Sequence, residues 1–163
     1  MNKPATSPRF LCDAMLGSLA RWLRLCGYDC LYLGTEPEDA ELARIAENEG
    51  RWLLTRDHEL AAVGPKTQMV RSGTLEAQLA EVLDRHELPP PEDLEAARCS
   101  DCNGILEDVS PDQVAAEVPP YVLETAERFR RCGGCRRIYW PGTHGEQIHI
   151  RFARVRHTMA RTE

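Results

Sequence analysis

Residues 10–33 read FLCDAMLGSLARWLRLCGYDCLYL, and this stretch decides the fold. A short apolar segment over residues 9–12 predicts a strand that runs directly into Asp13. Apolar residues then recur at spacings of three and four, which predicts an amphipathic helix that ends at Gly27. A second apolar run over residues 28–33 predicts another strand. The stretch therefore predicts a strand–helix–strand unit, the building block of a parallel sheet.

The same alternation continues to residue 83. A helix opens at Pro37-Glu38-Asp39, with acids in the first turn where the helix dipole favours them, and Gly50 closes it. A strand over 52–55, a short helix around Leu60, a strand over 68–70 and a helix over 75–83 follow. The 52–55 strand is apolar without alternation, as in a strand covered on both faces. The repeated units predict an α/β fold with a mainly parallel sheet between layers of helices.

Length and composition restrict the class of protein. The chain has 163 residues, of which 42% are apolar and 28% charged, which excludes a disordered chain, a collagen and a coiled coil. No apolar run approaches the roughly 18 residues of a membrane span, and the start lacks an apolar signal segment, so a cytoplasmic location is expected. Glycine motifs for nucleotides and for serine hydrolases are absent, so no small-molecule cofactor is expected.

Charge is unevenly distributed. Residues 1–98 hold eleven basic and seventeen acidic side chains, residues 99–127 hold seven acids and no base, and residues 128–161 hold nine Arg and one acid. A basic segment beside an acidic body predicts either a polyanion-binding surface or a solvated face. A hairpin in this segment is expected to project five arginines from one small surface: Arg128, Arg130, Arg131, Arg136 and Arg137. Arg21 and Arg24, off the apolar stripe of the first helix, are expected either to face phosphates or to pair with local acids.

Two Cys-x-x-Cys pairs, separated by 29 residues, follow the stiff break at Pro89-Pro90-Pro91. Four thiolates at tetrahedral corners complete a structural zinc site, with Zn–S of about 2.3 Å. Disulfides, a redox pair and iron are the alternatives, and a reducing cytosol disfavours the first. The predicted ligands are Cys99, Cys102, Cys132 and Cys135. Chelation is expected to unfold residues beyond about 95 and to spare the α/β body. The remaining cysteines are expected to be small buried apolar residues: Cys12, Cys26 and Cys30.

Three aspartates recur in one context. Asp13 and Asp57 each follow a predicted strand and precede a helix, and Asp39 opens the helix after the second strand. The carboxyl ends of parallel strands share one edge of the sheet, where ligands bind. Gathered carboxylates suit Mg²⁺ or Mn²⁺, which can activate water and stabilise charge on a phosphodiester. Each aspartate is also well placed as a helix cap, and that interpretation stays open.

Several of these motifs together resemble the Mut-seven C-terminal RNase domain family of PIN-like nucleases. The resemblance covers about residues 9–145 in the same order and rests on residues 10–29, 53–57, 118–122 and 139–144. It implies a PIN-like α/β domain, a zinc ribbon and metal-dependent RNase activity. Asp13 and Asp57 match the acidic positions at strand ends, and Asp39 matches an acid that opens the second helix. The chain departs from the pattern of many PIN nucleases after the fourth strand, where Val70-Arg71-Ser72-Gly73-Thr74 holds no carboxylate.

The sequence therefore predicts a PIN-like α/β domain over residues 8–88, a four-cysteine zinc ribbon over 95–145 and a basic C-terminal helix or tail over 146–163. The predicted function is a metal-dependent endoribonuclease that leaves a 3′-hydroxyl and a 5′-phosphate, with RNA as partner, structural zinc and catalytic Mg²⁺ or Mn²⁺. The alternative is a non-catalytic RNA-binding or ribosome-associated adaptor. The predicted catalytic residues are Asp13, Asp39 and Asp57, and the predicted RNA contacts are Arg21, Arg24, Arg130, Arg136 and Arg137.

Overall fold

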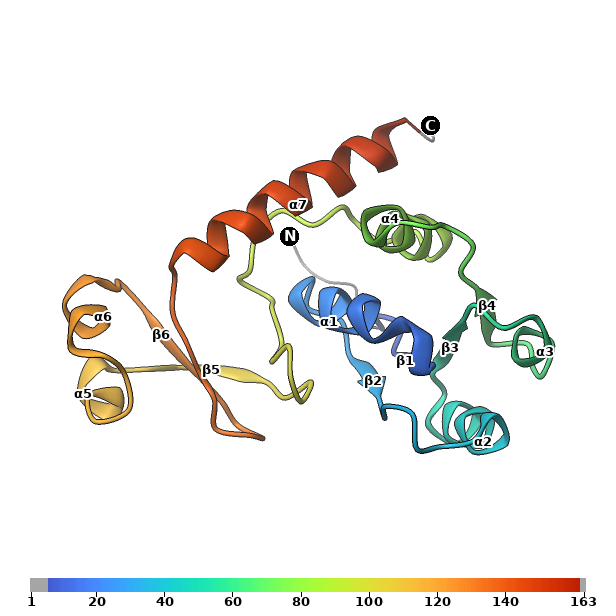
Figure 1. Ribbon diagram of the computed structural model, residues 1–163, viewed down its shortest axis with the longest axis horizontal. Coiled ribbons are helices and arrows are strands. Elements are labelled where there is room, and N and C mark those ends of the chain that lie inside the picture. Colours follow the sequence, from blue (N-terminus) through green and yellow to red (C-terminus); the bar gives the residue numbers. More distant parts are fainter. Residues whose placement is uncertain (1–5, 162–163) are drawn as a thin grey trace.

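The computed structural model describes residues 6–161 and confirms the α/β fold class (Figure 1). Four parallel strands form the main sheet in the order β2-β1-β3-β4. The strand and helix bounds of this α/β body are β1 (Phe10–Cys12), η1 (Ala14–Leu16), α1 (Gly17–Leu25), β2 (Cys30–Tyr32), α2 (Asp39–Glu49), β3 (Trp52–Thr55), α3 (His58–Ala61), β4 (Thr67–Met69) and α4 (Leu75–Arg85).

Helices cover both faces of this sheet, which gives three layers. On one face, strand residues such as Phe10 and Leu54 pack against Leu19 of α1 and Leu79 of α4. On the other face, the neighbouring strand residues pack against α2 and α3, as in the cluster of Leu11, Leu53, Leu42 and Leu60. Adjacent strand residues thus enter opposite cores, which is why the strands are apolar without alternation.

The order in which successive strands join the sheet reverses at β1: β2 is added on one side of it, and β3 and β4 are added on the other. The β1–α1–β2 unit steps to one side, and the next unit crosses back over β1 to β3 with α2 on the opposite face. β1 and β3 are therefore the neighbouring strands from whose carboxyl ends the chain leaves toward opposite faces. In open α/β sheets this topological switch point opens a crevice in which ligands bind.

A second, antiparallel sheet follows residue 98, in the order β5-β6-β7. Its core is small and apolar, with Val114, Val118, Val122 and Phe129 buried together. The Ser110–Pro111 signal opens a helix with a complete capping box, as the sequence indicates, whereas a second short helix after Pro119 had no recognised signal. The bounds of this ribbon module are β5 (Leu106–Val109), α5 (Pro111–Val114), α6 (Pro120–Thr125), β6 (Phe129–Cys132) and β7 (Ile138–Tyr139).

The last element, α7 (Thr143–Ala160), returns from the ribbon module to the α/β body and lies along α4 (Figure 1). Phe152 of α7 is fully buried, with its ring 5.8 Å from that of Trp22 on α1. Val155 joins the core under α1 and α4. The predicted C-terminal helix thus completes the α/β body. None of the helices within residues 6–161 combines the length and apolar character that a membrane span requires.

Candidate functional site

Asp13 lies directly after β1 and is only 6% exposed. One carboxylate oxygen accepts a hydrogen bond of 3.0 Å from the backbone N–H of Met15 and so caps the 3-10 helix η1. The other oxygen accepts a hydrogen bond from the hydroxyl of Thr55 at the end of β3. Asp13 is therefore both a helix cap and part of a side-chain network between the two central strands.

Asp57 belongs to the same network. Its backbone N–H donates to the Thr55 hydroxyl oxygen at 3.0 Å, while its Oδ1 accepts from the first backbone N–H groups of α3. Thr55 is fully buried, so its hydroxyl is fixed between these two partners. The structure thus brings Asp13 and Asp57 to one edge of the sheet, at the switch point between β1 and β3.

Asp39 is exposed in the first turn of α2, the helix that follows β2. Within residues 6–161, the four ribbon cysteines form the one group of three or more His, Cys, Asp or Glu whose ligand atoms all lie within 4.8 Å of one another. The three aspartates therefore do not meet that closely, and Thr55 joins the Asp13 carboxylate to the backbone of Asp57.

The segment after β4 is fixed from two sides. Glu81 of α4 accepts hydrogen bonds of 2.9–3.1 Å from the backbone N–H groups of Arg71 and Ser72. The guanidinium of Arg56 donates to the backbone carbonyls of Val70 and Ser72. Glu81 is thus engaged with the backbone, and the first charged side chain after β4 is the cation Arg71.

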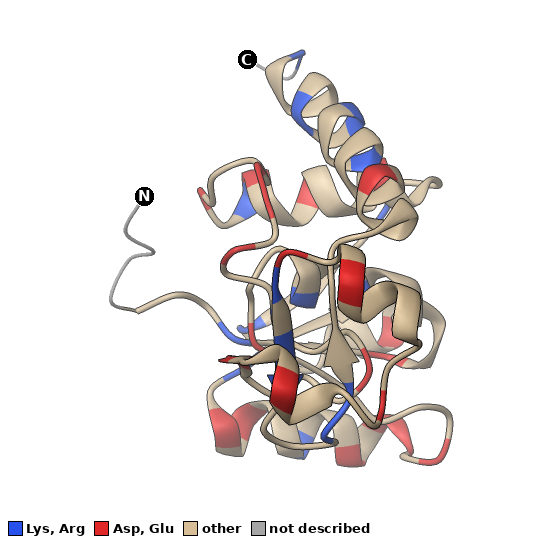
Figure 2. Cartoon of the chain, turned by 90° about the vertical axis from the view of Figure 1, so that its left-hand side faces the viewer, with Lys and Arg blue, Asp and Glu red and all other residues tan. Residues whose placement is uncertain are grey.

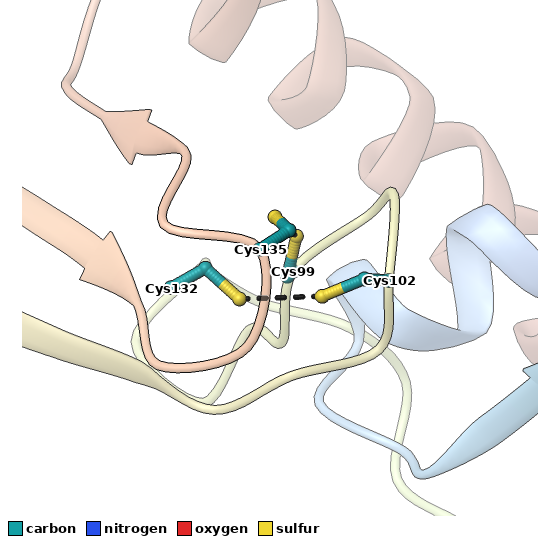
Figure 3. Close-up of side chains that lie close together, drawn as sticks. All are labelled: Cys99, Cys102, Cys132 and Cys135. Carbon is teal, nitrogen blue, oxygen red and sulfur yellow. Dashed lines mark hydrogen bonds between the residues drawn. The ribbon is translucent and has the colours of Figure 1, made fainter.

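The four cysteines meet between the two Cys-x-x-Cys segments (Figure 3). Sγ of Cys102 lies 3.3 Å from Sγ of Cys132, and Sγ of Cys99 lies 3.6 Å from Sγ of Cys135. A tetrahedral zinc with Zn–S of about 2.3 Å separates its sulfurs by about 3.8 Å, whereas a disulfide joins them at about 2.05 Å. The four thiols therefore form a group that can hold a metal, in the arrangement of a zinc ribbon.

The two segments, which we name the first knuckle (residues 99–104) and the second knuckle (residues 132–137), have the same backbone geometry. In each, the carbonyl of the first cysteine accepts from the N–H four residues later, at 2.9 Å from Asn103 and 3.1 Å from Arg136. Both of these residues adopt the left-handed conformation, with φ of 70° and 68°. The knuckles thus present their sulfurs to one another in matching turns.

Glycines make room for the sulfurs. A Cβ on Gly104 would lie 2.6 Å from Sγ of Cys132, and a Cβ on Gly134 would lie 3.2 Å from Sγ of Cys102. The backbone N–H of Gly134 also donates to Sγ of Cys132 at 3.3 Å. A backbone that approaches this closely, with an N–H directed at sulfur, fits four thiolates around one ion.

The thiols of the group differ in acidity. Burial raises the pKa of Cys132. A backbone hydrogen bond from Arg137 lowers the pKa of Cys135, but burial and the neighbouring cysteines raise it to about 12. Desolvation raises the pKa of Cys102, but hydrogen bonds involving Cys132 and the Gly104 backbone lower it to about 6, so this thiol ionises at neutral pH. Burial and the neighbouring Cys99 raise the pKa of Tyr139 to about 12, and its hydroxyl lies 3.0 Å from Sγ of Cys99. Tyr139 therefore keeps its proton, and its hydroxyl can donate a hydrogen bond to a thiolate at Cys99.

Arg24 has a different place from the one expected. It is 5% exposed, and its guanidinium donates to the backbone carbonyls of Cys30, Ser100 and Asp101 at 2.8–3.1 Å. The buried guanidinium thereby joins α1 to β2 and to the first knuckle. The expectation that Arg24 contacts RNA is wrong because all of these donors serve the interior. Arg21, one turn earlier, is exposed.

The ribbon arginines do not form one free basic surface. Arg128 pairs with Glu95 and Asp108, Arg131 pairs with Glu117, and Arg137 pairs with Asp101. Arg130 is half-buried and donates to the carbonyls of Leu94 and Leu106, so it joins the linker to β5. The expectation that Arg130 contacts RNA is therefore wrong, because its donors are engaged with the backbone. Arg136 is exposed and, within residues 6–161, makes no hydrogen bond or ion pair through its guanidinium.

The acids that neutralise this segment come from residues 95–117, which are close in space though separate in sequence. The arginines of α7 are also engaged: Arg151 lies over the Trp22 ring at 5.0 Å and pairs with Glu76, and Arg156 donates to the Pro91 carbonyl. Basic positions are spaced along α7, while acidic positions are spread over the other elements (Figure 2). Acids therefore neutralise Arg128, Arg131 and Arg137 of the ribbon module, whereas α7 keeps a row of basic positions.

Two site residues were missed from the sequence. Thr55 joins Asp13 to Asp57, and Asn103 joins the first knuckle to the turn before β2. A signal for Thr55 was present, because it ends a strand of otherwise apolar residues directly before a candidate acid. Asn103 carried a weaker signal, as a residue tolerant of the left-handed conformation after a Cys-x-x-Cys pair.

Comparisons with known proteins agree with the resemblance drawn from the motifs. The profile of the Mut7-C RNAse domain matches residues 8–152. A stretch of 52 residues is 44% identical to a human protein, "Exonuclease mut-7 homolog"; it covers 32% of this chain and 6% of the human protein. No solved structure matches the chain. Since the profile spans both the α/β body and the cysteine module, the chain belongs to the Mut7-C RNAse domain family.

Proposed function

We propose that this protein is a metal-dependent ribonuclease whose site lies at the switch point between β1 and β3. The observation that carries the proposal is the network in which the Thr55 hydroxyl donates to the Asp13 carboxylate and accepts from the Asp57 backbone. Acids at the carboxyl ends of two neighbouring parallel strands stand where such sheets bind ligands. Membership of the Mut7-C RNAse domain family supports the substrate class.

Asp13 and Asp57 would hold Mg²⁺ or Mn²⁺ through hard carboxylate oxygens, with Asp39 as a third acid from α2. The ion, when bound, would activate water and stabilise the charge on a phosphodiester. The chain fits this requirement in part: Oδ1 of Asp57 accepts two N–H groups, and within residues 6–161 no hydrogen bond engages its Oδ2. Thr55 would keep the Asp13 carboxylate in place while that ion is held.

In the ribbon module, Cys99, Cys102, Cys132 and Cys135 would hold structural zinc. All four ligand positions would be filled by sulfur, so this ion would have no open position for catalysis. Arg21, Arg136 and Arg137 remain as candidate RNA contacts because their side chains are exposed, and Arg137 would exchange Asp101 for a phosphate. Arg24 and Arg130 are no longer proposed for this role.

Cleavage of RNA in the presence and absence of Mn²⁺ tests the catalytic proposal. Asp13→Asn and Asp57→Asn should each lower the rate at least a hundredfold, a loss of roughly 2.7 kcal/mol in transition-state stabilisation. Asn keeps an oxygen for the capping hydrogen bonds, so both variants should fold. Asp112→Asn, on the exposed first turn of α5, is the matched control and should cleave normally.

The form of the RNA distinguishes the mode of cleavage. A circular RNA has no end, so its cleavage requires an endonuclease, which is the activity we propose. Cleavage of linear RNA alone would replace that proposal with an exonuclease. Binding of RNA with no metal-dependent cleavage in the wild-type protein would favour the non-catalytic adaptor.

A further inference from the structure

The first charged side chain after β4 is the cation Arg71, at the edge of the sheet that carries Asp13 and Asp57. Val70, the residue before it, donates its backbone N–H to the Thr55 carbonyl at 2.7 Å. The parallel register pairs Met69 with Thr55. Arg71 and Asp57 therefore each lie two residues beyond this paired level, Arg71 after Met69 and Asp57 after Thr55.

The direction of the Arg71 side chain follows from the alternation of the strand. Val70 is fully buried in the core under α1 and α4. Successive residues of an extended chain point to opposite faces, so Arg71 points away from that core. Cys12 and Leu54 also enter that core, so Asp13 and Thr55, one residue later on each strand, share the opposite side with Arg71.

The backbone at Arg71 is held rigidly while its side chain is not engaged. Glu81 accepts from the N–H groups of Arg71 and Ser72, and the Ser72 carbonyl accepts from Arg56 and Gln78. Within residues 6–161, the Arg71 guanidinium makes no hydrogen bond and no ion pair. Arg56, which is also near this edge, donates hydrogen bonds to the carbonyls of Val70 and Ser72, whereas the Arg71 guanidinium has no acceptor within residues 6–161.

Space is open beside this segment. A Cβ on Gly73 would meet no atom within 4 Å. The first turn of α4 begins soon after, at Leu75. A planar guanidinium with free donors, at the sheet edge that carries Asp13 and Asp57, suits a phosphate, because the five N–H donors of Arg match phosphate oxygens.

We propose that Arg71 is a positioning residue that binds a phosphate of the RNA strand beside the Asp13–Asp57 pair. A carboxylate at this position would repel that phosphate, whereas Arg71 offsets the negative charge of the body. The inference rests on the proposed nuclease site, since it names the chain's own contact to that site's substrate. It also assigns a reason to the absence of an acid after β4.

Binding of a fluorescein-labelled single-stranded RNA, measured by anisotropy in Ca²⁺ over a range of salt, tests this proposal. Arg71→Gln should weaken binding about tenfold, as expected for the loss of one charge-assisted hydrogen-bonded contact. The slope of log affinity against log salt should fall by about 0.7, the value for one phosphate contact on a single strand. Arg71→Lys should restore the slope but not the full affinity, because Lys lacks the planar fork.

Arg85→Gln is the matched control, since Arg85 is exposed at the opposite end of α4. It should change neither affinity nor slope. In cleavage assays, Arg71→Gln should raise KM more than it lowers kcat, which a merely structural role would not do. Equal affinity, slope and KM in Arg71→Gln and wild type would overturn the proposal even if the protein cleaves RNA. Loss of binding in Arg71→Gln, in a wild type that binds RNA without cleaving it, would support Arg71 and reject the nuclease.

Discussion

The carboxamide of Asn103 donates a hydrogen bond of 2.7 Å to the carboxylate of Asp29, so the first knuckle is joined to the turn before β2. The amide oxygen of Asn103 also accepts from the backbone N–H of Cys30 at 3.0 Å. Burial raises the pKa of Asp29, but hydrogen bonds from Arg51 and Asn103 lower it by more, to a net value below the ordinary one. A single knuckle side chain therefore caps an edge strand of the main sheet.

This contact predicts that the ribbon module and the α/β body unfold together. Asn103→Gly should lower the free energy of unfolding by about 2 kcal/mol, because it leaves the Cys30 N–H without a partner and removes one of the two side-chain donors to Asp29. Glycine tolerates the left-handed backbone, so the loss reports the side chain. Chemical denaturation followed by circular dichroism measures it.

Arg136→Gly is the matched control, since Arg136 has the same backbone conformation in the second knuckle and an exposed side chain. It should leave stability nearly unchanged. Equal effects of the two variants would mean that the Asn103 side chain contributes nothing. For the same reason, hydrogen exchange after chelation should increase in β2 as well as beyond residue 95, in contrast to the independent unfolding expected from the sequence.

The close approach of Gly104 to Cys132 allows a test of packing at the metal site. Gly104→Ala should lower zinc content well below one ion per chain, because its Cβ would lie 2.6 Å from Sγ of Cys132. Gly133→Ala lies in the same module, but its Cβ would be 3.7 Å from the nearest atom, an ordinary contact. Metal analysis of protein purified under reducing conditions should find zinc in Gly133→Ala and wild type. Iron in its place would change the identity of the ion, and no metal in the wild type would reject the site.

Substitutions at Thr55 can distinguish the effect of its hydroxyl group from the effect of its side-chain shape. Thr55→Val keeps the size of the side chain but removes the hydroxyl that joins Asp13 to Asp57. It should lower kcat for RNA cleavage at least tenfold, since Asp13 loses the bond that orients it. Thr55→Ser restores the hydroxyl and should recover most of the rate. A Val variant as active as wild type would show that Asp13 needs no such orientation.

His86 predicts a pH dependence of stability. Its ring lies at 4.7 Å from the ring of Trp52 and 5.1 Å from that of Phe10, and it hydrogen-bonds to Gln68. Burial, with the charge of Arg85, lowers the pKa of His86 below 6.5, so the folded protein binds this proton less readily than the unfolded chain. Its contribution is complete above about pH 6.5 and is lost as the pH falls through the folded pKa.

Unfolding free energies measured between pH 5 and 8 should therefore fall toward acid, with a slope from this group of at most about 1.4 kcal/mol per pH unit. His86→Gln should remove that share of the slope. His149→Gln, on the exposed side of α7, should leave it unchanged. A slope that persists in His86→Gln would assign the pH dependence to other groups.

The sequence by itself determined the parts that depend on local spacing. The periodicity of residues 15–26 and the left-handed Gly27 and Gly50 predicted two helices and their ends, and the unalternating 52–55 segment predicted a strand covered on both faces. The two Cys-x-x-Cys pairs predicted a four-sulfur group, because a tight turn brings two sulfurs together wherever it occurs. The chain's order of motifs also predicted its family.

Only the tertiary structure decided which charges are free. Arg24 and Arg130 read as surface cations in the sequence, but their partners are backbone carbonyls distant along the chain, at Ser100 and Leu94. The same holds for the acids: strand order places β1 beside β3, so Asp13 and Asp57 share Thr55, whereas Asp39 is on α2. Side-chain pairing depends on distance in space, which the packing of the strands and helices sets and local spacing does not.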